Sequence, residues 1–347
     1  MRSWSTRASR SRATSWTCGR PGTTIRHADA AGLRYAQQTL SQLADAGSLP
    51  ALSIVDHPDH RRRGYVLDIS RDRVPTNDTL RWLVRTLAEL RYNHLELYVE
   101  HTYAHAGHEV VWRHGSPLGP EDLRWLDPEC LAHGIELVPN RNTFGHMERW
   151  LRHDRYRPLA ECPEGAVSPF TGQTTPPTTL APTPATAEFA LGLVREMAAQ
   201  VSSRLVNIGA DEPFELGQGA SAAAVAERGR AEVYLEHLDR LVLPLVAEGH
   251  HVVFWGDVLR RRPDLVSRLP AEGVTAAVWR YDAPAEDGGL LARQGAWRLA
   301  ARAGLPGPTG DDLRDDLAEA VAHQRAAWAA ESRPGGLDDS LRHLPSP

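Results

Sequence analysis

The sequence contains no lysine, so every one of its 39 basic residues is an arginine. This absence excludes chemistry that needs a lysine, such as Schiff-base or pyridoxal-phosphate catalysis and phosphate binding by a Walker A loop. Cysteine is scarce as well. Cys18, Cys130 and Cys162 are an odd, widely spaced set, which gives neither a disulfide framework nor a paired zinc motif. The sequence therefore predicts no cofactor and no bound metal.

Excess positive charge and long apolar runs are also missing. The formal net charge of −5 gives no case for nucleic-acid binding. No apolar run approaches the ~18 residues of a membrane span. Residues 1–20 have no apolar core of a secretory signal, so the default expectation is a cytoplasmic protein. With 347 residues, 41% of them hydrophobic, the chain has room for one large domain with or without a small one.

What the sequence does have is a repeated alternation of strand-like and helix-like patterns. Units of ~35 to 50 residues of this kind predict a parallel sheet with helical crossovers. Six strands are visible, and an eight-stranded barrel needs two more. The polar, aperiodic segment 1–22 is expected to be disordered. The expected strands are 65–69, 94–99, 135–139, 205–208, 252–255 and 274–279, and the expected helices are 77–91, 120–133, 186–201 and 220–248, the last broken near Gly229.

Two adjacent carboxylates, Asp211 and Glu212, follow the strand 205–208 directly after Gly209 and Ala210. In a barrel of parallel strands the carboxyl ends of the strands form the active-site face. Neighbouring carboxylates repel each other, so we expect one to act as a proton donor and the other to stay charged. Such a pair can cleave a glycosidic bond.

The ends of five strands carry motifs that can be compared with known families. The motifs are Arg63-Gly-Tyr-Val-Leu-Asp68, Asn140-Arg-Asn142-Thr-Phe-Gly145-His146, Asp211-Glu212, Trp255-Gly-Asp257 and Trp279-Arg-Tyr281. Taken in order, they resemble the catalytic barrel of glycoside hydrolase family 20, the β-N-acetylhexosaminidases. The resemblance implies a (β/α)8 barrel at 61–285 that is incomplete after its sixth strand, with both ends truncated or altered. It also implies the remnant of a small α/β domain at 23–60 and an atypical helical tail at 286–347.

The resemblance implies removal of a terminal, non-reducing β-linked N-acetylglucosamine or N-acetylgalactosamine from a glycoside. In this family the 2-acetamido oxygen of the sugar is the nucleophile and forms an oxazolinium intermediate, so the protein supplies none. Glu212 would be the general acid and then the general base. Asp211 would orient the acetamido N–H and offset the charge that grows on the ring.

The resemblance also implies substrate-binding roles for six further residues. These are Arg63 for sugar hydroxyls, His146 beside the acid pair, Trp255 and Trp279 as walls of the acetamido pocket, Asp257 for another hydroxyl and Tyr281 for the acetamido oxygen.

The sequence also departs from the family pattern. Asn207 stands where the family usually has a histidine, Ala210 where it has a glycine, and Asn140 and Asn142 where it has acidic residues, which indicates a divergent branch.

Two other functions stay open at this point. One is an inactive or truncated sugar-binding barrel. The other is a barrel enzyme with a carboxylate nucleophile ~5 Å across the site from the acid, for which Asp257 or Glu100 would be the candidates. A metal site among His94, His101, His105 and His108 is disfavoured because their spacing does not match a helical zinc motif. The sequence does not indicate which oligomeric state the protein has.

Overall fold

The computed structural model describes residues 14–19, 22–45, 52–58, 60–71, 73–168 and 172–278. They belong to two compact units. The first draws its described residues from Met1–Thr143, Met147–Leu159 and Glu188–Ile208, and the second draws them from Phe144–His146, Ala160–Ala187 and Gly209–Pro347.

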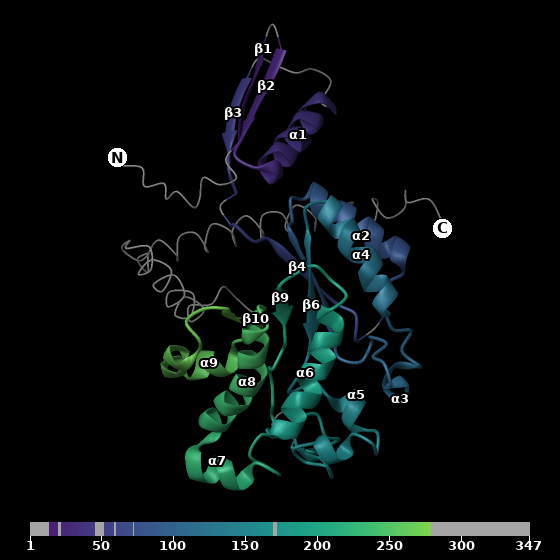
Figure 1. The fold of residues 1–347 in the computed structure, drawn as a ribbon, viewed down its shortest axis with the longest axis vertical. Coiled ribbons are helices and arrows are strands. Elements are labelled where there is room, and N and C mark those ends of the chain that lie inside the picture. Colours follow the sequence, from purple (N-terminus) through teal and green to yellow (C-terminus); the bar gives the residue numbers. More distant parts are fainter. Residues whose placement is uncertain are drawn as a thin grey trace. The chain divides into compact units, whose positions relative to one another are not determined.

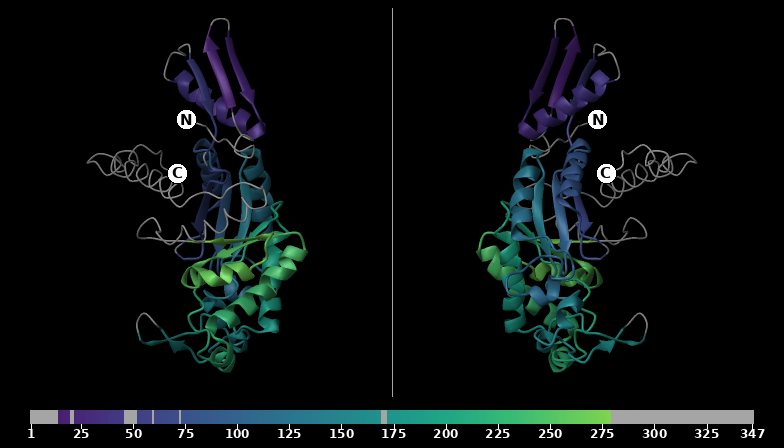
Figure 2. Two further views of the ribbon diagram at one scale, coloured as in Figure 1. Left: turned by 90° about the vertical axis from the view of Figure 1, so that its left-hand side faces the viewer. Right: turned by 90° about the vertical axis from the view of Figure 1, so that its right-hand side faces the viewer.

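The N-terminal part of the first unit is a small antiparallel sheet with one helix. Strands β1 (Thr14–Gly19), β2 (Gly22–His27) and β3 (Leu52–Asp56) lie in the order β2-β1-β3, and helix α1 spans Ala30–Asp45. Figure 2 shows α1 on one face of this sheet. The prediction of disorder for 1–22 is wrong for β1, which pairs with both other strands. One of its partners lies more than 30 residues further along the chain, so the local pattern could not reveal the pairing.

Four parallel strands follow in the first unit, in the order β4-β5-β6-β9. Helices α2 and α4 pack against each other, as Figure 1 shows. The Thr76 side chain caps α2 by accepting the Thr79 N–H at 3.3 Å, as expected for a residue before a helix. The elements are β4 (Gly64–Asp68), α2 (Asn77–Glu89), β5 (His94–Val99), α3 (Glu109–Trp112), α4 (Pro120–Ala132), β6 (Glu136–Arg141), α5 (Glu148–Leu151), a 3-10 turn at Arg157–Leu159 and β9 (Leu205–Asn207).

The core of this unit lies between the strands and the helices. Buried aliphatic residues alternate along β5, include Leu137 of β6, and recur at helical spacing in α2 and α4. They include Leu80, Val84 and Leu87 of α2, Leu95, Leu97 and Val99 of β5, Leu123 and Leu126 of α4, and Leu137 of β6.

The second unit continues the strand–helix alternation. Strands β10 and β11 are parallel neighbours. The predicted break near Gly229 is confirmed, because Gly229 has φ 87° and separates α7 from α8. The elements are β7 (Ala166–Val167), β8 (Thr174–Thr175), α7 (Ala222–Arg228), α8 (Arg230–Ala247), β10 (His251–Trp255), α9 (Asp257–Arg261), a 3-10 turn at Pro263–Arg268 and β11 (Val274–Ala277), while α6 (Pro184–Ala198) has residues in both units.

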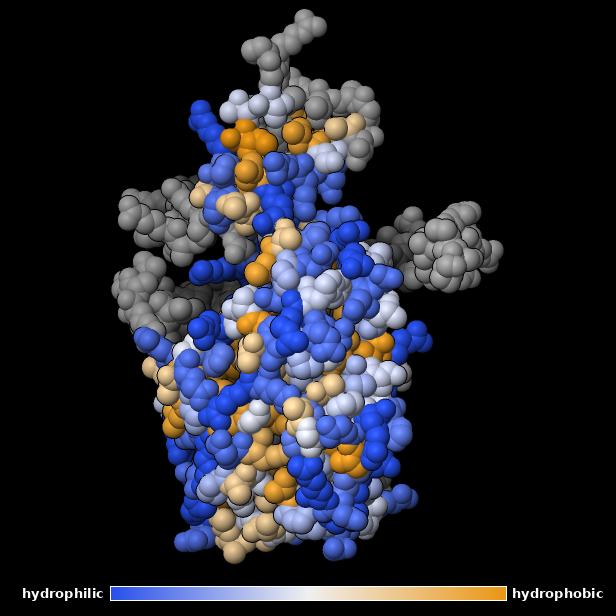
Figure 3. Space-filling view, turned by 45° about the vertical axis from the view of Figure 1, so that its right-hand side comes forward, coloured by the Kyte–Doolittle hydropathy of each residue, from blue (hydrophilic) through white to orange (hydrophobic). Residues whose placement is uncertain are grey.

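The described residues therefore contain the six predicted parallel strands, each followed or preceded by helices, which is the pattern of a partial (β/α)8 barrel. The seventh and eighth strands and the C-terminal tail lie outside the described residues. Hydrophobic and hydrophilic residues are interspersed on the face drawn in Figure 3. Among the described helices, none combines the length and the apolar character that crossing a membrane requires.

Candidate active site

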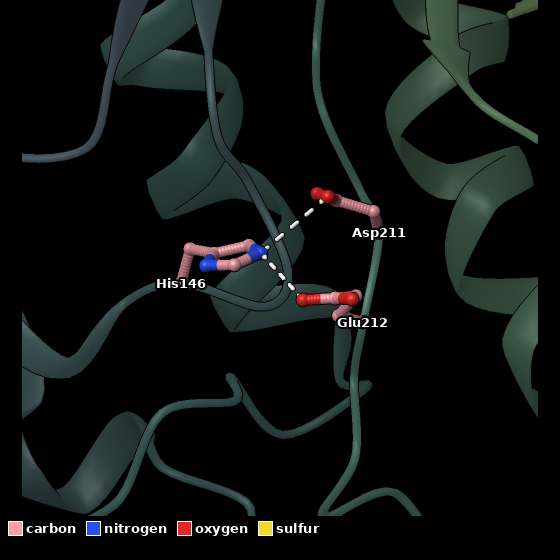
Figure 4. A group of neighbouring side chains, drawn as sticks. All are labelled: His146, Asp211 and Glu212. Carbon is pink, nitrogen blue, oxygen red and sulfur yellow. Dashed lines mark ion pairs between the residues drawn. The ribbon is translucent and has the colours of Figure 1, made fainter. Parts of the chain in front are cut away.

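Three side chains of the second unit meet at one point. His146 lies on the loop after β6, and Asp211 and Glu212 lie after β9. The His146 Nε2 is 3.4 Å from Asp211 Oδ2 and 3.2 Å from Glu212 Oε2. Figure 4 shows the imidazole facing both carboxylates through the same nitrogen. The predicted neighbourhood of His146 and the acid pair is therefore what the structure shows. Asp211 is the more buried carboxylate, with 10% of its side chain exposed against 28% for Glu212.

The turn that carries the pair has an unusual backbone. Gly209, Ala210 and Glu212 all have left-handed φ angles, of 64°, 63° and 48°. For a residue other than glycine this conformation costs about 1–3 kcal/mol and persists only when the surroundings enforce it. One contact that holds the turn is the hydrogen bond from the Trp255 N–H to the Gly209 carbonyl oxygen, at 2.8 Å. The sharp turn lets two consecutive residues present their carboxylates to the same imidazole.

The histidine loop fits closely against this turn. A Cβ on Gly145 would collide with the backbone carbonyl oxygen of Asp211, so only glycine allows this approach. His146 itself has a left-handed φ of 55°. The loop is also held by the Leu180 N–H, which donates to the Phe144 carbonyl oxygen at 3.0 Å. The close backbone packing fixes His146 beside the carboxylates.

Asp257, the first residue of α9, is a third carboxylate near the pair. Burial, together with the negative charge of Asp211, raises the pKa of Asp257 to about 6, although a hydrogen bond from the Glu212 backbone N–H opposes the shift. Its Oδ1 has no hydrogen-bond partner among the described residues. The structure places Asp257 beside the acid pair, where it adds to the local negative charge. Its predicted contact with a sugar hydroxyl stays a prediction.

The two tryptophans and the tyrosine predicted to bind the substrate are only partly described. Trp255 ends β10 and is half-buried. Trp279 and Tyr281 lie outside the described residues.

The structure does not bring Arg63 to the carboxyl end of the strands. Arg63 precedes β4, at its amino end, and its guanidinium donates to the Arg91 and His60 carbonyl oxygens and to the Tyr35 hydroxyl. Arg63 matches the family motif, but this motif begins at the amino end of the strand. The arginine nearest to the carboxyl end of β4 is Arg71, three residues after Asp68.

Arg71 belongs to a charged group of the first unit. It pairs with Asp68 and, at 3.0 Å, with Glu100, and it lies over the ring of Tyr98. The Tyr98 hydroxyl donates to Glu100 at 2.9 Å. The position of Arg71 after the strand is the sequence signal that places an arginine at the carboxyl end of β4.

Among the described residues, these three side chains also form a group that could hold a metal ion. His146, Asp211 and Glu212 offer one nitrogen and two carboxylate oxygens within 4.8 Å of one another. The histidines after β5 have other contacts: His105 bonds to Glu196 at 2.7 Å and His108 to the Tyr156 hydroxyl at 2.5 Å. Burial lowers the pKa of His105 to about 4, so it is neutral near pH 7.

A family model described as the catalytic domain of glycosyl hydrolase family 20 matches residues 114–301, more than half of the chain. Among curated proteins, hexosaminidase D of Bos taurus is 27% identical over 197 residues, which is 53% of this chain and 53% of that protein. A β-N-acetylhexosaminidase of Cellulomonas fimi is 28% identical over 59% of this chain and 46% of its own. The chain thus spans about half the length of these relatives.

Solved structures give the same fold. A family 20 β-N-acetylhexosaminidase from Streptomyces coelicolor A3(2) aligns with a TM-score of 0.61 at 23% identity, over 85% of this chain and 59% of that one. An exo-β-N-acetylglucosaminidase from Vibrio harveyi, solved with N-acetylglucosamine, aligns with a TM-score of 0.65 at 19% identity, over 82% and 48%.

Proposed function

Because the chain belongs to glycoside hydrolase family 20, we propose that it removes terminal β-linked N-acetylhexosamine from glycosides. We further propose that the reaction is substrate-assisted, retains the anomeric configuration and passes through an oxazolinium intermediate. The observation that carries the proposal is the pair of adjacent carboxylates that face one imidazole nitrogen at 3.2 and 3.4 Å. The similarity to proteins named as hexosaminidases supports the choice of sugar.

The different burial of the two carboxylates supports different roles. Glu212 is the more exposed of the two, so it can reach the oxygen of a leaving group. It acts as the general acid in the first step and as the general base toward water in the second. Asp211 is largely buried beside His146 and holds the acetamido N–H of the substrate. The resulting hydrogen bond directs the acetamido oxygen at the anomeric carbon and offsets the positive charge that forms there.

His146 supports the change of Glu212 from general acid to general base. Once Glu212 has given its proton to the leaving group, Asp211 and Glu212 both carry negative charge and repel each other. The His146 Nε2, in contact with one oxygen of each, reduces that repulsion by donating a hydrogen bond to either carboxylate. His146 therefore keeps Glu212 usable as a base for the second step.

Turnover of aryl glycosides by the whole chain tests the proposal. We expect release of p-nitrophenol from the β-N-acetylglucosaminide or the β-N-acetylgalactosaminide, and competitive inhibition by a thiazoline mimic of the oxazolinium. Binding of the thiazoline without turnover of either glycoside would support the alternative of an inactive sugar-binding barrel. Neither binding nor turnover would overturn both.

A further inference from the structure

Helix α8 contacts the chain on both sides of the acid pair. The Tyr234 hydroxyl donates to the Ala210 carbonyl oxygen at 3.0 Å. The Arg230 Nη2 donates to the Pro213 carbonyl oxygen at 2.6 Å. Because Arg230 and Tyr234 are four residues apart, they lie on the same face of the helix. We call these two side chains the α8 clamp, since they hold the residue before Asp211 and the residue after Glu212.

Tyr234 also contacts the histidine loop. Its ring stacks on Phe144, with the ring centres 5.9 Å apart and the planes at 29°, and Phe144 lies two residues before His146. The side chain is 1% exposed and Ala210 is completely buried. Burial, with the charges of Asp257 and Asp211, raises the pKa of Tyr234 well above its usual value, so the hydroxyl keeps its proton. One buried phenol thus joins both segments that carry the three site residues.

We propose that Arg230 and Tyr234 are positioning residues that aim the Glu212 carboxyl at the leaving-group oxygen. This inference rests on the proposed function and adds the means by which the acid is oriented. The left-handed conformations of Ala210 and Glu212 persist only where the surroundings enforce them, and the α8 clamp supplies hydrogen bonds on both sides of the turn. Without the clamp, the turn relaxes and the acid loses its alignment.

The substitution Tyr234→Phe tests the inference because it removes one hydroxyl and keeps the ring stack. The readout is kcat/KM, which reports the step in which the leaving group departs, for two N-acetylglucosaminides, one with a phenyl leaving group and one with a 2,4-dinitrophenyl leaving group. A basic leaving group departs only when the acid protonates it, whereas an activated leaving group scarcely requires protonation. We therefore expect a loss of at least about tenfold for phenyl and of less than about threefold for dinitrophenyl. A purely structural defect would lower both rates by the same factor.

Tyr103→Phe is the matched control. The Tyr103 hydroxyl is also buried, but it has no hydrogen-bond partner in the described structure. This variant should leave both rates, and their ratio, as in the wild type. Arg230 is exposed, so the variant Arg230→Gln leaves the core unchanged and provides a second test. We expect the same selective loss of rate for the phenyl glycoside, but a smaller one.

Hydrogen exchange gives a readout that does not depend on turnover. The Phe214 N–H donates to the Glu212 carbonyl oxygen at 2.7 Å and so reports the closure of the turn. We expect faster exchange over 209–216 in Tyr234→Phe and Arg230→Gln than in the wild type, and no change in Tyr103→Phe. Wild-type exchange in both variants would overturn the inference, as would equal loss for the two leaving groups. Absence of turnover in the wild type would instead refute the proposed function. The hydrogen-exchange rates of the variants would then be the test of whether the α8 clamp holds the turn.

Discussion

Two glutamates of the second unit, Glu161 and Glu212, have opposite surroundings. Glu161 is completely buried, and its Oε1 accepts hydrogen bonds from the backbone N–H groups of Gly217, Gly219 and Ser221 and from the Ser221 hydroxyl. Glu212 is 28% exposed and faces a histidine that it shares with another carboxylate. Several donors hold a buried carboxylate in one place, whereas a partly exposed carboxylate can reach a bound substrate. We propose that the first arrangement serves stability and the second serves proton transfer.

The largest expected effect is that of Glu212→Gln. The amide cannot donate or accept the transferred proton, so kcat for p-nitrophenyl N-acetylglucosaminide should fall by about 10²–10⁴-fold. The melting temperature should not fall, because the substitution removes a negative charge beside Asp211. A variant that keeps a near-wild-type rate would show that Glu212 is not the acid.

The next effect concerns pH. The pKa of Asp257 is about 6 in the folded protein, above its usual value, so the native state binds this proton more tightly than the unfolded state. The contribution of Asp257 to stability is therefore present at low pH and is lost as the pH rises from about 4 to about 6, by on the order of 2–3 kcal/mol.

Asp257→Asn should remove this pH dependence. The variant should gain stability relative to the wild type as the pH rises through that window, which melting curves at pH 4 and pH 7 would measure. The same difference in melting temperature at both pH values would contradict the account.

The smallest effect is expected for Glu161→Gln. The amide keeps one acceptor oxygen but turns an NH2 group toward donors, which should cost about 1–3 kcal/mol of unfolding free energy. Denaturant unfolding measures this loss. Turnover per folded molecule should stay close to that of the wild type, in contrast to Glu212→Gln. Unchanged stability together with lost turnover would show that the two glutamates do not divide the roles in this way.

Much of this architecture could be predicted because it depends on local patterns. An alternating apolar pattern identifies β5, a continuous apolar run identifies β10, and two small residues before Asp211 identify the end of β9. Strand β1 could not be predicted, since its hydrogen bonds come from β2 and from the distant β3.

The candidate site was predicted less completely than the fold. The acid pair follows from its place after a strand, and His146 follows from the resemblance to the family. The left-handed backbone at Ala210 and Glu212 could not be predicted, because these residue types favour other conformations and only tertiary contacts enforce this one. Arg63 and Arg71 lie at opposite ends of one strand. Only the strand bounds distinguish Arg63, which donates to the Arg91 carbonyl oxygen at the amino end, from Arg71 at the carboxyl end.

The central claim is that the substrate supplies the nucleophile while Glu212 supplies the proton. Comparing p-nitrophenyl β-N-acetylglucosaminide with p-nitrophenyl β-glucoside tests it most directly, because the second sugar lacks the acetamido group. The account predicts a kcat/KM at least about 10²-fold higher for the N-acetyl substrate, since an internal nucleophile has a large advantage in proximity. Equal hydrolysis of the two glycosides would contradict it.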